Sequence, residues 1–334
     1  MDPSDMGIPP IALLQLLERG TLGVRATDEF RSVMFRERVD LATLISKEEQ
    51  VPLRWFHSVY PTLDVDHATV LGFMLAEEAQ LTTFGPLSLP LISASSVLEV
   101  VELLTYLPVI STAVSPQFYP GEHELTIGLS GQTNDHVLDC LAVSYCGRAL
   151  LRLLDILAGD MPAVTLKLSW PAPSADPKHH LLQCERVEFD APTSFVRIPR
   201  TSLDKVCRFS DAVAYRVGVD SLRQNLASRN GRSSMTERVT RLIEADPAKA
   251  STRAIAIELS ISVSTLKRRL SDEGTSFRDL RQSVLQAVAI VRLLDRSLSV
   301  SRVATGLGYS DVSNFSHAFR RWTGQSPYEF RSGH

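Results

Sequence analysis

Hydrophobic residues recur at helical spacing through one long segment near the C-terminus, residues 277–294. Its apolar positions lie three or four residues apart and therefore share one face of a helix: Leu280, Val284, Val288, Val291 and Leu294. This periodicity predicts an amphipathic helix, which at 1.5 Å of rise per residue is about 27 Å long. A rigid helix of that length can hold two smaller structures apart.

The N-terminal part of the chain mixes two other patterns. Residues 97–104 and 137–157 have helical periodicity, whereas residues 125–129 and 164–170 alternate apolar and polar positions, as half-buried strands do. We therefore expect an α+β fold for this part, with a sheet order that the pattern does not define. The apolar faces of the two helices could line a pocket, but such stripes more often form ordinary core.

A short polar run separates the two parts. Residues 228–234 include the turn signal Asn230–Gly231, and a chain of 334 residues is long enough for about two domains. We expect residues 1–228 to form the α+β domain and residues 229–234 to form a linker. Residues 235–334 are then an all-α domain, starting at a helix whose Ser234 and Glu237 have the spacing of a capping box.

The all-α part contains an internal repeat. Four positions recur at an offset of 48 residues: Ala256, Leu259, Ile261 and Ser262 return as Ala304, Leu307, Tyr309 and Ser310. Two later positions recur at an offset of 49, Leu266 and Leu270 returning as Phe315 and Phe319. Each unit predicts a short helix with an inward alanine, a tight turn, a serine N-cap and a second helix, which is the pattern of a helix-turn-helix.

The second helix of each unit presents polar and cationic side chains. We expect these helices at Ser262–Glu273 and Ser310–Thr323, with Phe315, Phe319 and Trp322 turned inward. The long segment between them would space two DNA-reading helices by about one turn of DNA, roughly 34 Å. The predicted DNA-binding residues are Ser264, Thr265, Lys267, Arg268, Ser271, Ser313, Asn314, His317, Arg320 and Arg321.

Charge is distributed unevenly along the chain. The net charge is −3, yet residues 232–334 carry 16 Lys and Arg against 10 Asp and Glu, a net charge of +6. The remainder of the chain is therefore acidic, at −9. A basic C-terminal domain attached to an acidic body favours a nucleic-acid partner for the former and a separate task for the latter.

Several other classes of protein are disfavoured. The four cysteines form no C-x-x-C pair, and no cationic and apolar leader is visible, which indicates a reducing, cytoplasmic location. Charged residues interrupt the most apolar regions, so we expect no membrane span. The pair His179–His180 lies in an apparent loop without a third ligand at metal spacing, and we expect neither a metal nor a cofactor.

An enzyme is also disfavoured, because the sequence holds no nucleotide-binding, nucleophile-elbow or zinc-protease motif. His57 and His67 flank Tyr60 and Asp64 without any feature that makes them an acid–base pair. Two further interpretations stay open. Arg320–Arg321 taken alone is typical of a solvated surface, and the helical end could dock a protein partner instead of DNA.

Residues 251–331 resemble the two-motif DNA-binding domain of the AraC/XylS transcriptional regulators. The resemblance is most specific in the second unit, in Gly308–Ser310, Phe315–Ser316, Ala318–Trp322, Gly324–Pro327 and Phe330–Arg331. The short form of Leu270–Phe277 is similar to the branch that carries an arabinose-binding-type N-terminal domain. Weaker matches to that branch lie in Phe84–Leu89, Val187–Phe189 and Ala191–Pro199.

The resemblance implies a bacterial one-component regulator, more often an activator than a repressor. It implies that residues 1–228 bind a small effector and dimerise, and that residues 235–334 bind double-stranded DNA. Homodimerisation and contact with RNA polymerase are the further partnerships it suggests. Many relatives carry arginine where His317 stands, so we expect the first reading helix, with Lys267 and Arg268, to carry most of the sequence specificity.

Overall fold

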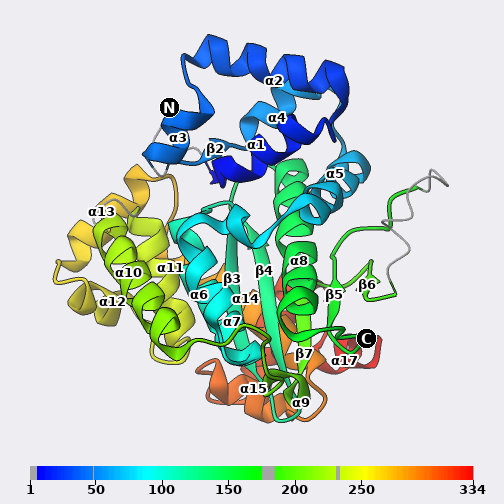
Figure 1. The fold of residues 1–334 in the computed structure, drawn as a ribbon. Coiled ribbons are helices and arrows are strands. Elements are labelled where there is room, and N and C mark those ends of the chain that lie inside the picture. The colour runs from blue at the N-terminus through cyan, green and yellow to red at the C-terminus, as the bar shows by residue number, and fades with distance from the viewer. Residues whose placement is uncertain (1–5, 48, 175–184, 231–233, 334) are drawn as a thin grey trace. The chain divides into compact units, whose positions relative to one another are not determined.

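The computed structural model describes residues 6–47, 49–174, 185–230 and 234–333. These residues belong to two compact units. Unit 1 comprises residues 1–118 and 123–228, and unit 2 comprises residues 119–122 and 229–334. Figure 1 shows mixed helices and strands in the former and helices in the latter. The predicted fold class, an α+β domain followed by an all-α domain with a long central helix, is confirmed.

Unit 1 begins with helices around a short two-stranded ladder. Its elements up to residue 109 are β1 (Gly7–Ile8), α1 (Pro10–Arg19), α2 (Gly23–Glu37), α3 (Leu41–Ser46), β2 (Val51–Pro52), α4 (Arg54–Val59), α5 (Val65–Glu78), the 3₁₀ helix η1 (Leu81–Leu87), α6 (Ser88–Ser93), α7 (Val97–Glu102) and the 3₁₀ helix η2 (Leu103–Val109). The helix predicted over residues 97–104 is therefore α7 with the first turn of η2.

The rest of unit 1 forms a sheet and the helices around it. These elements are β3 (Val114–Pro120), β4 (Glu124–Gly131), α8 (His136–Ala158), β5 (Thr165–Lys167), β6 (Val187–Glu188), β7 (Phe195–Pro199), α9 (Arg200–Leu203) and α10 (Ala212–Asn230). Among the described residues the strand order is β3-β4-β7-β5-β6. The β4–β7 and β5–β7 pairs are antiparallel, and Val196 of β7 pairs with Ile127 on one side and Leu166 on the other.

Helix α8 organises the core of unit 1, packing against α5 and against strands β4 and β5. The predicted segment 137–157 lies within it. Gly72 of α5 permits a close approach to α8, because a Cβ at this position would lie 2.6 Å from the Leu141 carbonyl oxygen. Trp170 is buried over the same region and donates its indole N–H to the Thr69 hydroxyl at 2.8 Å.

The predicted linker, residues 229–234, lies partly outside the described residues. Helix α10 continues to Asn230, so the first two residues of the predicted 229–234 segment are helical, and residues 231–233 lie outside the described residues.

Unit 2 is a bundle of short helices around one long helix. It consists of α11 (Met235–Ala245), α12 (Thr252–Glu258), α13 (Val263–Asp272), α14 (Phe277–Leu294), α15 (Val300–Gly306), α16 (Val312–Thr323) and α17 (Pro327–Gly333). The predicted long segment coincides with α14. Of its predicted inward face, Val284, Val288 and Val291 are buried and the two end leucines are partly buried.

The repeat is visible as two helix pairs, α12–α13 and α15–α16. Ala256 and Ala304 are both buried, at 2% and 1% exposure, where the first helix of each pair lies close to its neighbours. Ser251, Ser262 and Ser299 accept hydrogen bonds from the backbone as N-caps of α12, α13 and α15. The small inward residue of each unit and the Ser262 cap of the first unit are as predicted.

The cap of α16 differs from the prediction. Asp311, not Ser310, is the N-cap, because its carboxylate accepts the Asn314 N–H at 2.7 Å. The Ser310 hydroxyl donates a hydrogen bond to the same carboxylate at 3.0 Å. Asp311 lies four residues before Phe315, as Ser262 lies four before Leu266, so the one added residue falls ahead of the cap. Both serine and aspartate are good caps, and the register of the buried phenylalanines selects the later one.

Candidate DNA-binding interface

Helix α13 presents most of its polar side chains to solvent. Leu266 and Leu270 are buried in the core of unit 2 and fix the rotation of α13 about its own axis. Four of the predicted residues are exposed on the remaining faces: Ser264, Lys267, Arg268 and Ser271. The fifth, Thr265, is partly buried, and its hydroxyl lies 2.8 Å from that of the N-cap Ser262. Thr265 therefore supports the start of the helix at the same time as it borders the exposed face.

The cations of α13 are free to meet an anionic partner. Lys267 and Arg268 have no ion-pair partner among the residues that the structure describes, and the same holds for the exposed Arg269. Arg269 was absent from the predicted set, although it belongs to the same run of three cations in the sequence. A helix with three cations on one turn, none of them ion-paired among the described residues, is a natural site for phosphate contacts.

Helix α16 exposes a second set of donors. Ser313, Asn314, His317 and Arg321 are exposed, while Phe315 and Phe319 are fully buried and Trp322 is partly buried against them, as predicted. The Asn314 side-chain amide donates to Asp311 at 2.6 Å, which holds it over the first turn. The Asn314 N–H bond and the Ser310 hydroxyl together keep the pKa of Asp311 below its usual value.

Arg320 has a partner inside the protein. Its guanidinium lies 3.0 Å from the carboxylate of Glu329 on α17. Glu329 in turn accepts the Ser326 N–H at 2.6 Å, and the Ser326 hydroxyl accepts the Glu329 N–H at 3.2 Å, which is a reciprocal capping box. The Ser326 bonds and Arg320 together lower the pKa of Glu329 to about 2. Arg320 thus ties α17 to α16 on the exposed side of the unit.

Aromatic side chains hold α16 in place from the inner side. Phe319 stands 5.7 Å from Phe315 and 5.4 Å from Phe330 between ring centroids, and Tyr309 stands 5.5 Å from Phe315. Gly308, which precedes this tyrosine, has a φ of +85°, and a Cβ there would lie 2.8 Å from the Ala248 carbonyl oxygen. The turn between α15 and α16 therefore requires glycine both for its backbone angle and for the close approach.

A carboxylate links the start of the unit to α13. Glu273, at the C-terminal end of α13, accepts the backbone N–H groups of Met235 and Thr236, each at 2.7 Å. The expected capping box has only one of its two parts in this arrangement: Ser234 accepts the Glu237 N–H at 3.1 Å, but the N-terminal N–H groups of α11 are bonded by Glu273. A partner 37 residues distant could not be read from local spacing.

We expect Glu273→Gln to destabilise unit 2 by about 1 kcal/mol at pH 7, because one of two bonds to the N-terminus of α11 is lost. Partial burial opposes ionisation of Glu273, yet the bonds from Thr236 and Met235 prevail and hold its pKa below the ordinary 4.5. The contribution is therefore complete above pH 4.5 and declines as the pH falls below it. Denaturant unfolding at pH 7 and pH 4 measures both effects.

The matched control is Asp272→Asn, the same loss of charge one residue away on an exposed side chain. It should leave the stability of unit 2 unchanged. Equal effects of the two substitutions, or a Glu273→Gln deficit that does not shrink at low pH, would show that Glu273 does not act through its carboxylate.

The other candidate residues from the sequence have structural partners. The His57 ring lies 2.9 Å from Asp135, the N-cap of α8, and the His67 ring lies 2.7 Å from Asp64, the N-cap of α5. The described residues hold no cluster of three metal-ligating side chains. The pair His179–His180 lies outside the described residues. Within the described part of the chain, no helix is both long and apolar enough to cross a membrane.

Comparison with known families matches both parts of the chain. The model described as a helix-turn-helix domain matches residues 255–333. The model of the arabinose-binding domain at the N-terminus of AraC transcription regulators matches residues 63–206. The chain belongs to the AraC family of transcriptional regulators.

Individual AraC-type relatives cover different shares of the chain. The HTH-type transcriptional regulator Rv1395 of Mycobacterium tuberculosis is 32% identical over 53% of this chain and 52% of its own length. The regulator VqsM of Pseudomonas aeruginosa is 46% identical over 22% and 23%. The ornithine utilization regulator of the same organism is 22% identical over 78% of each chain. The chain thus spans about half the length of the first of these relatives.

Proposed function

We propose that this AraC-family chain is a sequence-specific DNA-binding transcriptional regulator, an activator controlled by a small effector. The observation that carries the proposal is the pair of helices α13 and α16. Each is the second helix of a repeated pair, is fixed by buried residues on one face and exposes donors on the other. The three cations of α13, which have no ion-pair partner among the described residues, supply the charge that DNA phosphates require.

The two helices would occupy successive major-groove segments on one face of the duplex. Helix α14 has 18 residues, so its length of about 27 Å plus the helix widths matches one turn of DNA, about 34 Å. In α13 we assign base reading to Arg268 and phosphate contact to Lys267, with the hydroxyls of Ser264, Thr265 and Ser271 beside them. Arg268 suits a guanine because its guanidinium can donate two parallel hydrogen bonds.

In α16 we assign DNA contact to Ser313, Asn314, His317 and Arg321. Arg320 belongs to the same proposed surface, but its ion pair with Glu329 makes positioning of α17 its main contribution. The His317 ring has two nitrogens and cannot form the bidentate contact to a guanine that an arginine forms, so α16 contributes less specificity than α13.

Regulation would arise in residues 1–228, with residues 235–334 as the DNA reader. An effector bound in the first domain can change DNA binding only if its affinity differs between two states of the protein. We further propose a homodimer and a contact with RNA polymerase as the partners of an activator of this kind. Such a protein acts in the cytoplasm, where bacterial promoters lie.

The test is recovery of genomic DNA fragments with the full chain, followed by binding of the recovered fragment at increasing salt. Each phosphate contact should add about 0.9 to the slope of log affinity against log salt. Lys267→Glu should lower that slope by at least about one unit. Failure to enrich any fragment, or binding insensitive to salt, would reject DNA binding and leave protein docking as the role of unit 2.

A further inference from the structure

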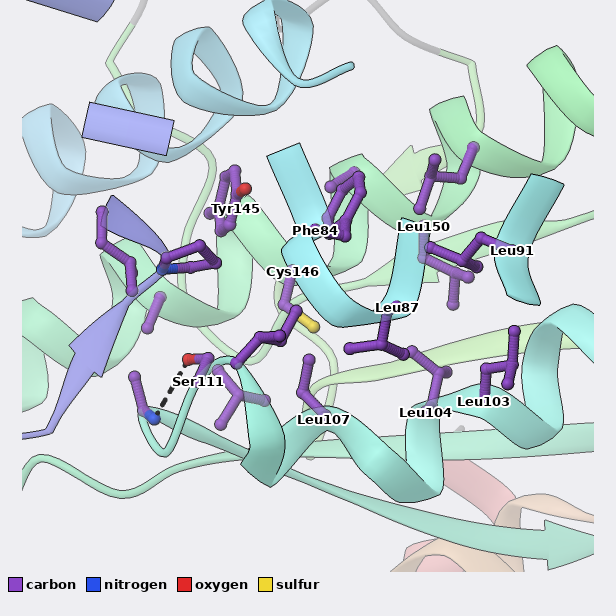
Figure 2. A pocket seen from close by; sticks show the side chains of 18 of the residues that line it. Phe84, Leu87, Leu91, Leu103, Leu104, Leu107, Ser111, Tyr145, Cys146 and Leu150 are labelled. Carbon is purple, nitrogen blue, oxygen red and sulfur yellow. Dashed lines mark hydrogen bonds between the residues drawn. The ribbon is translucent and has the colours of Figure 1, made fainter. Parts of the chain in front are cut away.

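Unit 1 contains an apolar cavity of about 50 Å³. Its walls are the side chains of α8 together with those of η1, α6, α7 and η2, and Ile8 of β1 closes one side. Figure 2 shows leucines of η1 and η2 facing Cys146 and Leu150 of α8. The two helical segments whose apolar faces the sequence offered as pocket walls, within residues 97–104 and 137–157, both contribute to it.

The chemistry of the walls is uniform. Every lining residue is uncharged, and the cavity surface is almost wholly apolar. Only three lining side chains carry a hydroxyl or thiol: Ser111, Tyr145 and Cys146.

The three polar side chains leave little capacity for a polar ligand. The Ser111 hydroxyl already donates to the Gly7 carbonyl at 2.7 Å and accepts the Ala113 N–H at 3.3 Å. The buried Tyr145 hydroxyl has no hydrogen-bond partner among the described residues. Burial raises the pKa of the Cys146 thiol to about 12, so the thiol is neutral at pH 7.

These walls select against polar and charged small molecules. A sugar brings several hydroxyls, and an amino acid brings two charges, whereas the walls offer one unpaired hydroxyl and one thiol. Polar groups without partners are costly to bury, and unpaired charges are costlier still. An apolar molecule instead gains free energy for each carbon it removes from water.

We propose that this apolar cavity is the effector site and that its ligand is a neutral, mostly apolar molecule with no more than one hydroxyl or carbonyl group. The ligand's role as an effector rests on the regulatory function proposed above, whereas its chemical class rests on the cavity walls. The binding of such a ligand is a property of unit 1 alone and is measured without DNA.

The size of the cavity limits how a ligand enters. Its volume is about a third of the roughly 150 Å³ of an engineered cavity that binds benzene. A ligand longer than a few carbon atoms must therefore displace the leucines of η1 and η2. Both segments are short 3₁₀ helices that contain a proline, Pro86 or Pro108, and their hydrogen bonding is weaker than that of an α-helix.

Calorimetric titration of the full chain with straight-chain alcohols, from 1-butanol to 1-octanol, tests the ligand class. Affinity should rise about fourfold for each added methylene until the cavity is filled. The carboxylates of equal chain length should bind at least about tenfold more weakly, and L-arabinose and L-ornithine should give no heat of binding. No binding of any alcohol, or equal binding of alcohol and carboxylate, would overturn the proposal.

Two substitutions of Cys146 in opposite directions locate the site. Cys146 lines the cavity and is partly exposed, and its sulfur faces the leucines of the cavity. Cys146→Leu should fill the cavity and weaken 1-octanol binding at least about tenfold, without lowering the melting temperature. Cys146→Ala should enlarge the cavity and keep or strengthen binding of the longest alcohol. Identical effects of both variants would place the alcohol elsewhere.

The outcome for DNA is read separately. A chain that binds 1-octanol in this cavity but does not bind DNA contradicts the regulatory function and leaves the ligand class intact. A chain that binds its DNA fragment but not the alcohols contradicts the ligand class alone.

Discussion

An Arg268→Ala chain is expected to bind its recovered DNA fragment about 5- to 150-fold more weakly than the wild type, a loss of about 1 to 3 kcal/mol. The reason is that Arg268 is exposed on α13, has no ion-pair partner among the described residues and can donate two hydrogen bonds to one guanine. Gel-shift titration on the recovered fragment and on random DNA of equal length measures the effect.

The comparison of the two DNAs decides the role of this side chain. If Arg268 reads a base, the loss on the recovered fragment exceeds the loss on random DNA. Equal losses of affinity on the two DNAs would show that Arg268 contacts a phosphate and does not read a base. The matched control is Arg296→Ala, an exposed arginine that follows α14 and lies outside both reading helices, and it should change affinity on the two DNAs equally and slightly.

Phe319→Ala is expected to lower the free energy of unfolding of unit 2 by about 3 to 5 kcal/mol. Phe319 is fully buried and packs edge-on against Phe330 and tilted against Phe315, so truncation leaves a cavity that neighbouring rings cannot close. Hydrogen–deuterium exchange of the full chain, followed by mass spectrometry, resolves peptides of α16 from those of unit 1. Protection should fall throughout unit 2.

Phe35→Ala is the control for this substitution. Phe35 lies on α2 and is 84% exposed, so its truncation should cost less than about 0.5 kcal/mol. An exchange pattern of Phe319→Ala confined to the residues around α16 would show that unit 2 does not fold as one cooperative body.

Local sequence features predicted the reading helices closely. The bounds of α14 followed from periodicity, and α13 followed from Ser262 and the inward Leu266 and Leu270. Such features depend on residues three or four apart, which a sequence displays directly. The prediction of Ser310 as the cap of α16 was wrong, because Asp311 is an equally competent cap and only the packing of Phe315 distinguishes the two.

Distant contacts could not be predicted in this way. Glu273 bonds to Met235 and Thr236, and Arg320 pairs with Glu329 across two helices, although each side chain alone is typical of a solvated surface. The order of the five described strands depends on non-local pairing. The sequence offered residues 97–104 and 137–157 as pocket walls but favoured ordinary core for them, because a wall leucine and a core leucine have the same pattern in the sequence.

The central claim is that α13 and α16 read two successive major-groove segments. Methylation protection of guanine N7 on the recovered DNA fragment tests it most directly, since that atom lies in the major groove. The account predicts two protected clusters about 10 base pairs apart on one face of the duplex, with Arg268→Ala removing one cluster and leaving the other. A single continuous cluster, or loss of both clusters together in that variant, would contradict it.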